Sequence, residues 1–194
     1  MNVENFRELF KSAGFLLLLT FLMIPFKLPV TPGEESSPEQ QGWKPEWMVV
    51  DPDKKFVSFT LIGGYDGSNG TFNFNGFSEG ELTLTVPVGW KVEMKYTTKS
   101  AYKPHSAGIT EITEPIPQDD GNLAFAGAAT NQFVRGIHAN NSDTFTFIAK
   151  KPGKYWLFCG VSGHGKGGMW DYFVVSETAD RPSVHIEKKA RKEE

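Results

Sequence analysis

The chain has 194 residues, of which 39% are hydrophobic, and this size suits one domain with appended segments. Its formal net charge of -3 at pH 7 argues against a nucleic-acid partner, and its single cysteine excludes an intramolecular disulfide. The many aromatic residues and 20 glycines favour an all-β domain with many turns over a helical bundle.

The first thirty residues contain the apolar run FLLLLTFLMIPF. Arg7 and Lys11 precede it, and Lys44 is the next basic residue after Lys27, so the N-terminus is expected in the cytoplasm. The run is as short as a signal-peptide core, but prolines crowd the place where a cleavage site would lie. We predict that residues 1–30 are a single-pass anchor in the cell membrane, with a cleaved signal segment as the alternative. The rest of the chain is then expected on the extracytoplasmic, periplasmic side.

Residues 31–50 are rich in Pro, Glu, Ser and Gln and are predicted to form a polar linker. The domain is predicted at residues 51–176, where apolar and polar residues alternate with period two in several short runs. These predicted strands are 55–62, 81–88, 91–98, 143–149, 153–159 and 170–175. Strands of this length, separated by Gly and Pro turns, predict a β-sandwich or a barrel. The less regular segment 114–142 is predicted to be an insertion between strands.

The charged residues 177–194 are predicted to be a solvated tail, either a short helix or disordered.

The run YWLFCGVSGHGKGGMW at residues 155–170 carries the strongest chemical signal. It places four residues between Cys159 and His164 and four between His164 and Met169. A thiolate, an imidazole and a thioether are the donors that suit copper cycling between Cu(I) and Cu(II), whereas zinc would recruit another Cys or His in place of Met169. The glycines between the donors are predicted to permit the sharp chain reversals that bring three ligands to one ion.

The trigonal copper site needs a second imidazole. We predict that His105 supplies it, because it follows the strand predicted at 91–98 and a strand end is a rigid mounting. His138 is the alternative and is otherwise read as an exposed loop residue, while His185 lies in the predicted tail.

On these residues the sequence resembles the cupredoxins, and among them the sulfocyanin and rusticyanin group of blue copper proteins. The resemblance rests on the Cys-x4-His-x4-Met spacing with its following Trp170, and on PHS at 104–106, where Ser106 follows the upstream histidine. Plastocyanin-like members, with Cys-x2-His in this loop, fit less well. The resemblance spans about residues 55–175, while Asp171, where many relatives have glycine, departs from it.

The resemblance implies an all-β Greek-key sandwich that binds one type 1 copper through His105, Cys159 and His164, with Met169 as the axial ligand. It implies an electron carrier, not an enzyme, which is tethered to the membrane, is expected to be a monomer, and meets redox proteins such as cytochromes or a terminal oxidase transiently. His164 is then expected near the surface, in an apolar patch formed by residues such as Val161, Trp170 and Ala107. Ser106 is a candidate to hydrogen-bond near the site.

Other functions fit the same residues less well. A dinuclear copper centre needs two cysteines in the loop, and a catalytic copper site would leave open the position that Met169 fills. A hydrolase with Cys159 as nucleophile would not need Met169. A copper carrier or storage protein usually clusters Met or His, whereas the five methionines here are scattered. The carrier or storage protein and a copper-containing subunit of an oxidoreductase remain the alternatives.

Overall fold

A computed structural model describes residues 45–187, and all of its regular elements except one 3-10 turn are β-strands. The strands are β1 (Met48–Asp51), β2 (Phe56–Gly63), β3 (Leu82–Pro87), β4 (Lys91–Thr98), β5 (Gly108–Thr110), β6 (Ser142–Ile148), β7 (Gly153–Phe158), β8 (Trp170–Ser176) and β9 (Ser183–Ile186). The 3-10 turn, η2, spans Ser68–Thr71. The six strands predicted from the alternation of residues are confirmed to within a residue or two at their ends.

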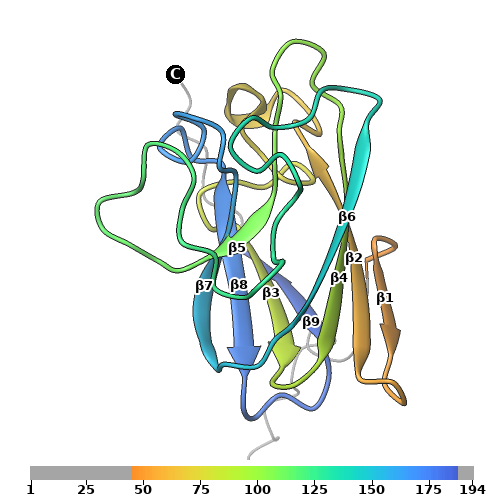
Figure 1. The fold of residues 1–194 in the computed structure, drawn as a ribbon. Helices are drawn as coiled ribbons and strands as arrows, with labels where there is room; N and C mark the ends of the chain where they lie inside the picture. The colour runs from red at the N-terminus through yellow and green to blue at the C-terminus, as the bar shows by residue number, and fades with distance from the viewer. Residues whose placement is uncertain (1–44, 188–194) are drawn as a thin grey trace, which may run out of the picture. The chain divides into compact units, whose positions relative to one another are not determined.

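The strands form two sheets, with the orders β1-β2-β4-β6 and β5-β7-β8-β3-β9 (Figure 1). The chain crosses from one sheet to the other between β2 and β3 and again at each step as far as β7, and these crossings make β2 parallel to β4 and β3 parallel to β8. Such crossings distinguish a Greek-key sandwich from a series of hairpins. The predicted all-β sandwich is confirmed.

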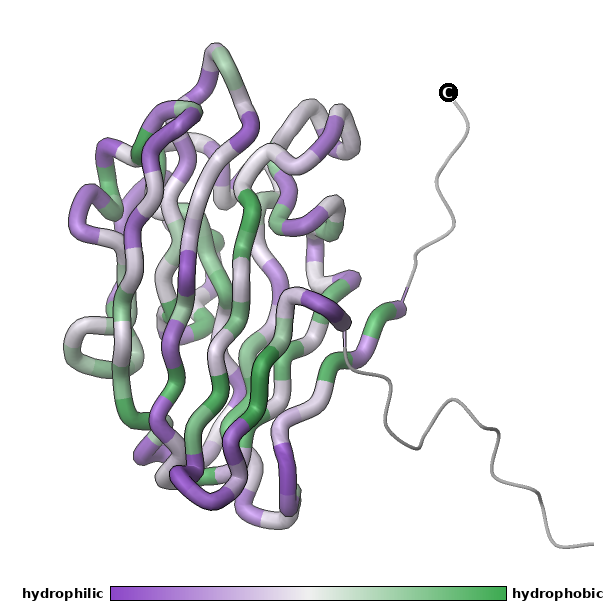
Figure 2. Tube along the Cα trace, turned by 90° about the vertical axis from the view of Figure 1, so that its right-hand side faces the viewer, coloured by the Kyte–Doolittle hydropathy of each residue, from purple (hydrophilic) through white to green (hydrophobic). Residues whose placement is uncertain are grey.

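The core lies between the sheets because alternate residues of strands such as β3, β4 and β8 are buried there. Figure 2 shows hydrophobic and hydrophilic residues following one another along the strands. In β4, Val92, Met94 and Tyr96 are buried while Lys91 and Lys95 are exposed. Burial of these large side chains supplies most of the free energy that holds the sheets together, at about 25 cal/mol per Å² of apolar surface.

Two strands lie outside the predicted domain limits of 51–176. β1 falls mostly in the predicted linker and pairs with β2, while β9 falls in the predicted tail and pairs antiparallel with β3. Val184 and Ile186 of β9 pack against the core. Both strands have only four residues, and β9 is set among charged residues, so their pairing with an adjacent strand stabilises them more than their own sequence pattern does.

The predicted membrane anchor and most of the predicted linker lie outside the described residues. Within residues 45–187, no helix has the length and apolar character that crossing a membrane requires.

The connections that matter for the site gather at one end of the sandwich, the upper end in Figure 1. They are the β2–β3, β4–β5, β5–β6 and β7–β8 connections. Asp171 anchors one of them: its buried carboxylate accepts a hydrogen bond of 3.0 Å from the backbone N–H of Leu82, which ties the start of β8 to the start of β3. This contact explains the aspartate that follows Trp170.

Candidate metal centre

The β7–β8 hairpin brings Cys159 and Met169 together. Phe158 and Trp170 are paired across the hairpin, so the residues that follow and precede them lie opposite each other. The N–H of Cys159 donates to the carbonyl of Met169 at 3.2 Å, and the N–H of Met169 donates to the carbonyl of His164 at 2.9 Å. The loop therefore folds back on itself twice, and this brings the side chains of Cys159, His164 and Met169 together.

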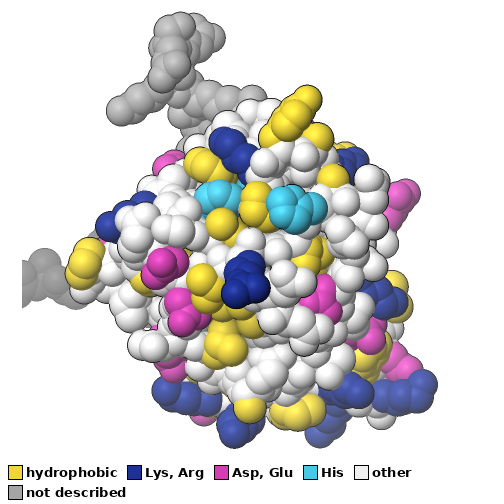
Figure 3. All heavy atoms as spheres, turned by 45° about the horizontal axis from the view of Figure 1, so that its top comes forward, with side chains coloured by type: hydrophobic (Ala, Val, Ile, Leu, Met, Phe, Trp, Pro, Cys, Tyr) yellow, Lys and Arg dark blue, Asp and Glu magenta, His cyan; other side chains and the backbone are white. Residues whose placement is uncertain are grey.

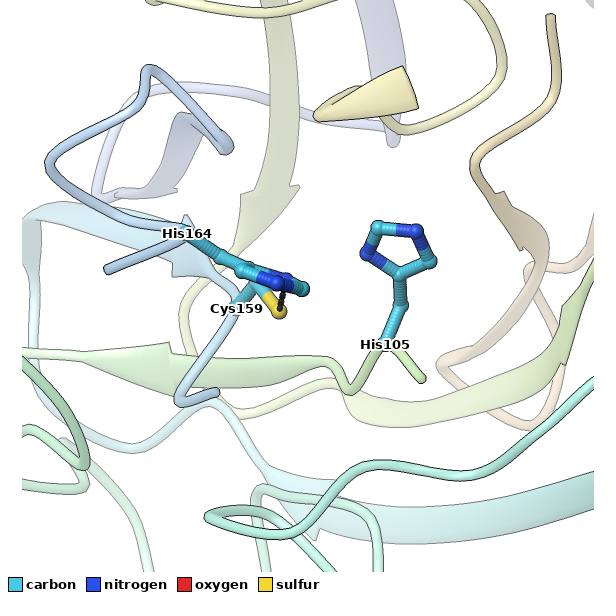
Figure 4. Close-up of side chains that lie close together, drawn as sticks. All are labelled: His105, Cys159 and His164. Atoms are coloured by element: carbon cyan, nitrogen blue, oxygen red, sulfur yellow. Dashed lines mark hydrogen bonds between the residues drawn. The ribbon is translucent and has the colours of Figure 1, made fainter. Parts of the chain in front are cut away.

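His105 reaches the same place from the β4–β5 connection. Its backbone exchanges two hydrogen bonds with Ile137, at 3.1 Å and 2.8 Å, which fixes the residue although it is outside a regular strand. Figure 4 shows the His105 ring facing the side chains of Cys159 and His164. His105 was predicted to follow a strand end, and in the structure it lies a few residues after the end of β4.

The four predicted ligands are buried next to one another. The candidate ligand atoms of His105, Cys159 and His164 all lie within 4.8 Å of one another. Cys159 Sγ is 3.5 Å from His164 Nδ1, and His105 Nδ1 is 3.1 Å from Met169 Sδ. His105, Cys159 and Met169 have no exposed surface, and His164 is 8% exposed.

Burial sets the protonation of this cluster. The pKa values of His105 and His164 are both lowered to about 4, chiefly by burial. At His105 the charge of His164 and the Lys103 ammonium contribute to this, and at His164 the Lys103 ammonium contributes. Both imidazoles are therefore neutral at pH 7 and offer a lone pair. Burial raises the pKa of the Cys159 thiol, against hydrogen bonds that favour the thiolate.

Ser106 supplies most of those hydrogen bonds. Its backbone N–H donates to Cys159 Sγ at 3.4 Å, and its hydroxyl lies 3.6 Å from the same sulfur. The hydroxyl also accepts from the N–H of Gly160 at 3.0 Å, and the backbone of Val161 provides a further hydrogen bond to the sulfur. Ser106 therefore connects the His105 segment to the cysteine, as its place after the histidine suggested.

The chemistry of the four buried side chains suits a copper ion. Two neutral imidazoles and one thiol form a buried three-atom set with a thioether beside it, which is the donor set of a type 1 site. Bonds of about 2.0 to 2.3 Å at trigonal angles would separate neighbouring donor atoms by about 3.6 Å, close to the 3.5 Å between Cys159 Sγ and His164 Nδ1. His105 Nδ1 lies beside Met169 Sδ, whereas His105 Nε2 has no hydrogen-bond partner among the described residues.

The glycines of the loop serve two purposes, and the sequence predicted only one of them. Gly163 and Gly168 adopt positive φ angles of 80° and 93°, which permits the expected reversals. Gly165, in contrast, leaves room for an aromatic ring, because a Cβ atom there would collide with Phe158. The same holds for Gly160 against Phe133 and Gly167 against Phe72.

Phe72 is the site residue that sequence reasoning missed. It comes from the β2–β3 connection, and its ring centroid lies 4.5 Å from that of His164 and 6.3 Å from that of His105. The only signal for it was an aromatic residue in a Gly- and Asn-rich segment, which does not reveal a contact across the fold.

The apolar patch expected around His164 differs from the prediction. Ala107 is fully buried, and Trp170 packs with Trp156 and Tyr172 in a separate cluster on the outer side of β7 and β8. Val161 is half-buried and packs against the core.

The two remaining histidines are not in the cluster. His138 is exposed in the β5–β6 connection, although the adjacent Ile137 is bonded to His105. His185 is exposed on β9. Among the residues that the structure describes, His105, Cys159 and His164 form the one group of this kind that could hold a metal ion.

Comparisons with known proteins agree with this donor set. A family model described as the Sulfocyanin (SoxE) domain matches residues 46–186. A curated sulfocyanin from Sulfolobus acidocaldarius is 31% identical over 140 residues, which cover 69% of this chain and 70% of that protein.

Solved structures with a similar fold include auracyanin A from Chloroflexus aurantiacus, described as a "blue" copper protein. It is 19% identical, with a TM-score of 0.45, and the match covers 62% of this chain and 99% of that one. Rusticyanin from Thiobacillus ferrooxidans is 15% identical, with a TM-score of 0.43, over 67% of this chain and 86% of that one. Because both TM-scores are low, the assignment of the family rests on the two sequence matches. The chain belongs to the sulfocyanin family, whose members are cupredoxins that carry electrons on one type 1 copper ion.

Proposed function

We propose that this protein is a membrane-tethered carrier of single electrons on the extracytoplasmic side, with His105, Cys159, His164 and Met169 as the ligands of its copper ion. The observation that carries the ligand assignment is the buried cluster in which the first three donors lie within 4.8 Å of one another and Met169 Sδ lies 3.1 Å from His105 Nδ1. Copper bound there would supply a one-electron couple.

The chain's own residues suit an electron carrier better than an enzyme. The site is buried, its imidazoles are neutral, and its four donors leave no obvious open position for a substrate. Hydrogen bonds from Ser106 and the surrounding apolar side chains hold the ligands in place, which keeps the rearrangement small when the charge of the centre changes.

The anchor is the part of the proposal that rests on sequence alone. Its support is the apolar run at Phe15–Phe26 with basic residues before it. N-terminal sequencing of the protein extracted from membranes tests it: an intact start of the chain is expected for an anchor, and a start near residue 30 would show a cleaved signal instead.

The copper assignment is tested by colour. The domain mixed with Cu(II) is expected to become intensely blue or green, because a copper–thiolate bond absorbs strongly in the visible range. Cys159→Ala is expected to stay colourless. A colourless copper complex of the unmodified protein would contradict the electron-carrier function.

The histidine assignment has a matched pair of variants. His105→Ala is expected to abolish the colour, whereas His138→Ala, at an exposed imidazole in a neighbouring loop, is expected to keep it. The opposite result would assign the second imidazole to His138.

A further inference from the structure

The ring of Phe72 lies against the imidazole of His164, the ligand with some exposed surface. The two rings are 4.5 Å apart at their centroids and inclined by 39°. Phe72 is itself half-buried and His164 is 8% exposed, so a protein that approaches on this side meets Phe72 together with the imidazole.

The Phe72 ring is held in place by asparagines. Asn69 Nδ2 donates to the carbonyl of Phe72 at 3.0 Å and to that of Gly167 at 2.8 Å, which ties the β2–β3 connection to the ligand loop. Asn73, fully buried, accepts from the N–H of Tyr65 at 3.0 Å and donates to the carbonyl of Ser68 at 2.7 Å. The contact with His164 therefore belongs to a fixed arrangement, with little left to order on binding.

Two lysines of the β4–β5 connection lie over aromatic rings of this segment. Lys103 Nζ is 4.4 Å from the centroid of Phe72 and donates to the carbonyl of Gly70 at 3.4 Å. Lys99 Nζ is 4.1 Å from the centroid of Tyr65. Both lysines are exposed, and cation–π contacts of this kind orient an ammonium group without neutralising it.

Within residues 45–187, neither Lys99 nor Lys103 takes part in an ion pair. Asp66, an acidic residue of the same segment, uses its carboxylate to accept from the N–H of Ser68 at 2.9 Å and from Asn73 Nδ2 at 3.3 Å. Figure 3 shows this end of the molecule, with histidine and hydrophobic side chains at the surface and Lys or Arg as well as Asp or Glu side chains around them.

We propose that Lys103, Phe72 and His164 form the docking and electron-entry point for a redox protein that is acidic at its own electron-donating edge. The proposal rests on the proposed function and adds the chemistry of the partner. Carboxylates of the partner would pair with Lys103 and Lys99, and its apolar surface would contact Phe72 and Tyr102, which is 95% exposed. The partner would be oxidised by one electron, and the copper that the four ligands would hold would be reduced by that electron, while no proton moves.

A matched control exists on β7. Lys154 Nζ lies 3.3 Å from the centroid of the Tyr172 ring and is also exposed, so it has the same chemistry. It stands five residues before Cys159, about 16 Å away along the strand. Lys154→Glu and Lys103→Glu change the net charge equally, and only the second changes the charge beside His164.

The docking part is tested on metal-free protein, so its outcome does not depend on copper. Hexacyanochromate(III), a paramagnetic trianion, is added and the broadening of backbone amide signals is mapped. We expect broadening at residues 65–72 and 99–103, its loss in Lys103→Glu and its persistence in Lys154→Glu. Broadening centred on β7 and β8, or broadening that survives in Lys103→Glu, would overturn the proposal. Signals at 65–72 that shift with protein concentration in the absence of the probe would identify a second copy of the chain as the occupant and would also overturn it.

The entry part is tested on copper-loaded protein by its rate of electron exchange with the ferrocyanide–ferricyanide couple. At low ionic strength we expect Lys103→Glu to slow the exchange roughly tenfold and Lys154→Glu to slow it less than about twofold. With the cationic hexaammineruthenium couple, Lys103→Glu should accelerate the exchange. Equal effects of the two variants would mean that only net charge acts, and would overturn Lys103 as the docking residue.

Discussion

The metal end and the strand core of this sandwich are stabilised in different ways. In the core, alternate residues of paired strands bury apolar side chains, and Leu84, Met94 and Phe173 have no exposed surface. At the metal end, neutral imidazoles and a thiol are buried on segments outside regular strands, where glycines, Ser106 and asparagines fix the backbone. Burial of apolar side chains in the core therefore stabilises the fold, whereas burial of polar groups with few hydrogen-bond partners at the metal end lowers its stability.

Among single substitutions, the largest effect is expected in the core. Phe173→Ala on β8 removes a fully buried ring that packs against Phe147, and it should lower the free energy of unfolding by about 3 to 5 kcal/mol. Denaturant unfolding of the metal-free variant measures this change. A loss below about 1 kcal/mol would mean that the core does not carry the stability in the way described.

A smaller loss is expected from Gly165→Ala in the ligand loop, because the new methyl group would collide with the ring of Phe158. Overpacking of this kind lowers the free energy of unfolding by about 1 to 3 kcal/mol. Gly67→Ala is the control: it lies in the β2–β3 connection at φ of -74°, and a Cβ atom there meets nothing within 4 Å. Equal unfolding free energies for the two variants would show that the loop moves aside for the methyl group.

A dependence on pH is expected from the two imidazoles of the metal end. In metal-free protein, the folded state resists protonation of His105 and His164 until about pH 4, whereas the unfolded chain takes up these protons near pH 6.5. The unfolded state thus binds more protons between these values, and the free energy of unfolding should fall as the pH is lowered from about 6.5 to 4.

This pH dependence is checked by comparing the metal-free protein with a double variant, His105→Gln and His164→Gln, over the same range. Carboxylates titrate in both proteins, so the difference between the two curves isolates the imidazoles. Parallel curves would contradict the lowered pKa values of the two histidines.

Most of the sandwich was predictable because its strands follow a local rule. The alternation of apolar and polar residues in segments such as Lys91–Thr98 depends only on the period of a strand, and it located six strands. β1, β5 and β9 were missed because three or four residues are too few to establish a period, and their pairing with β2, β7 and β3 is a long-range property.

The ligand loop was predictable for a different reason. Cys159, His164 and Met169 lie within one hairpin, so their spacing and chemistry could be read together. The place of His105 could be predicted only from its position after a strand, and Phe72 could not be predicted at all.

The sequence by itself determined the alternating strands, the donor types and their spacing in one loop, because these properties depend on neighbouring residues. The tertiary structure decided which distant residues meet: His105 lies beside the hairpin, Ser106 contacts the sulfur of Cys159, and Phe72 packs against His164 with Lys103 over its own ring. It also showed that Gly165 makes room for Phe158, whereas the sequence had predicted only freedom of the backbone. Such contacts join segments that are far apart in the chain, and they are fixed by how the two sheets pack and how the connections cross between them.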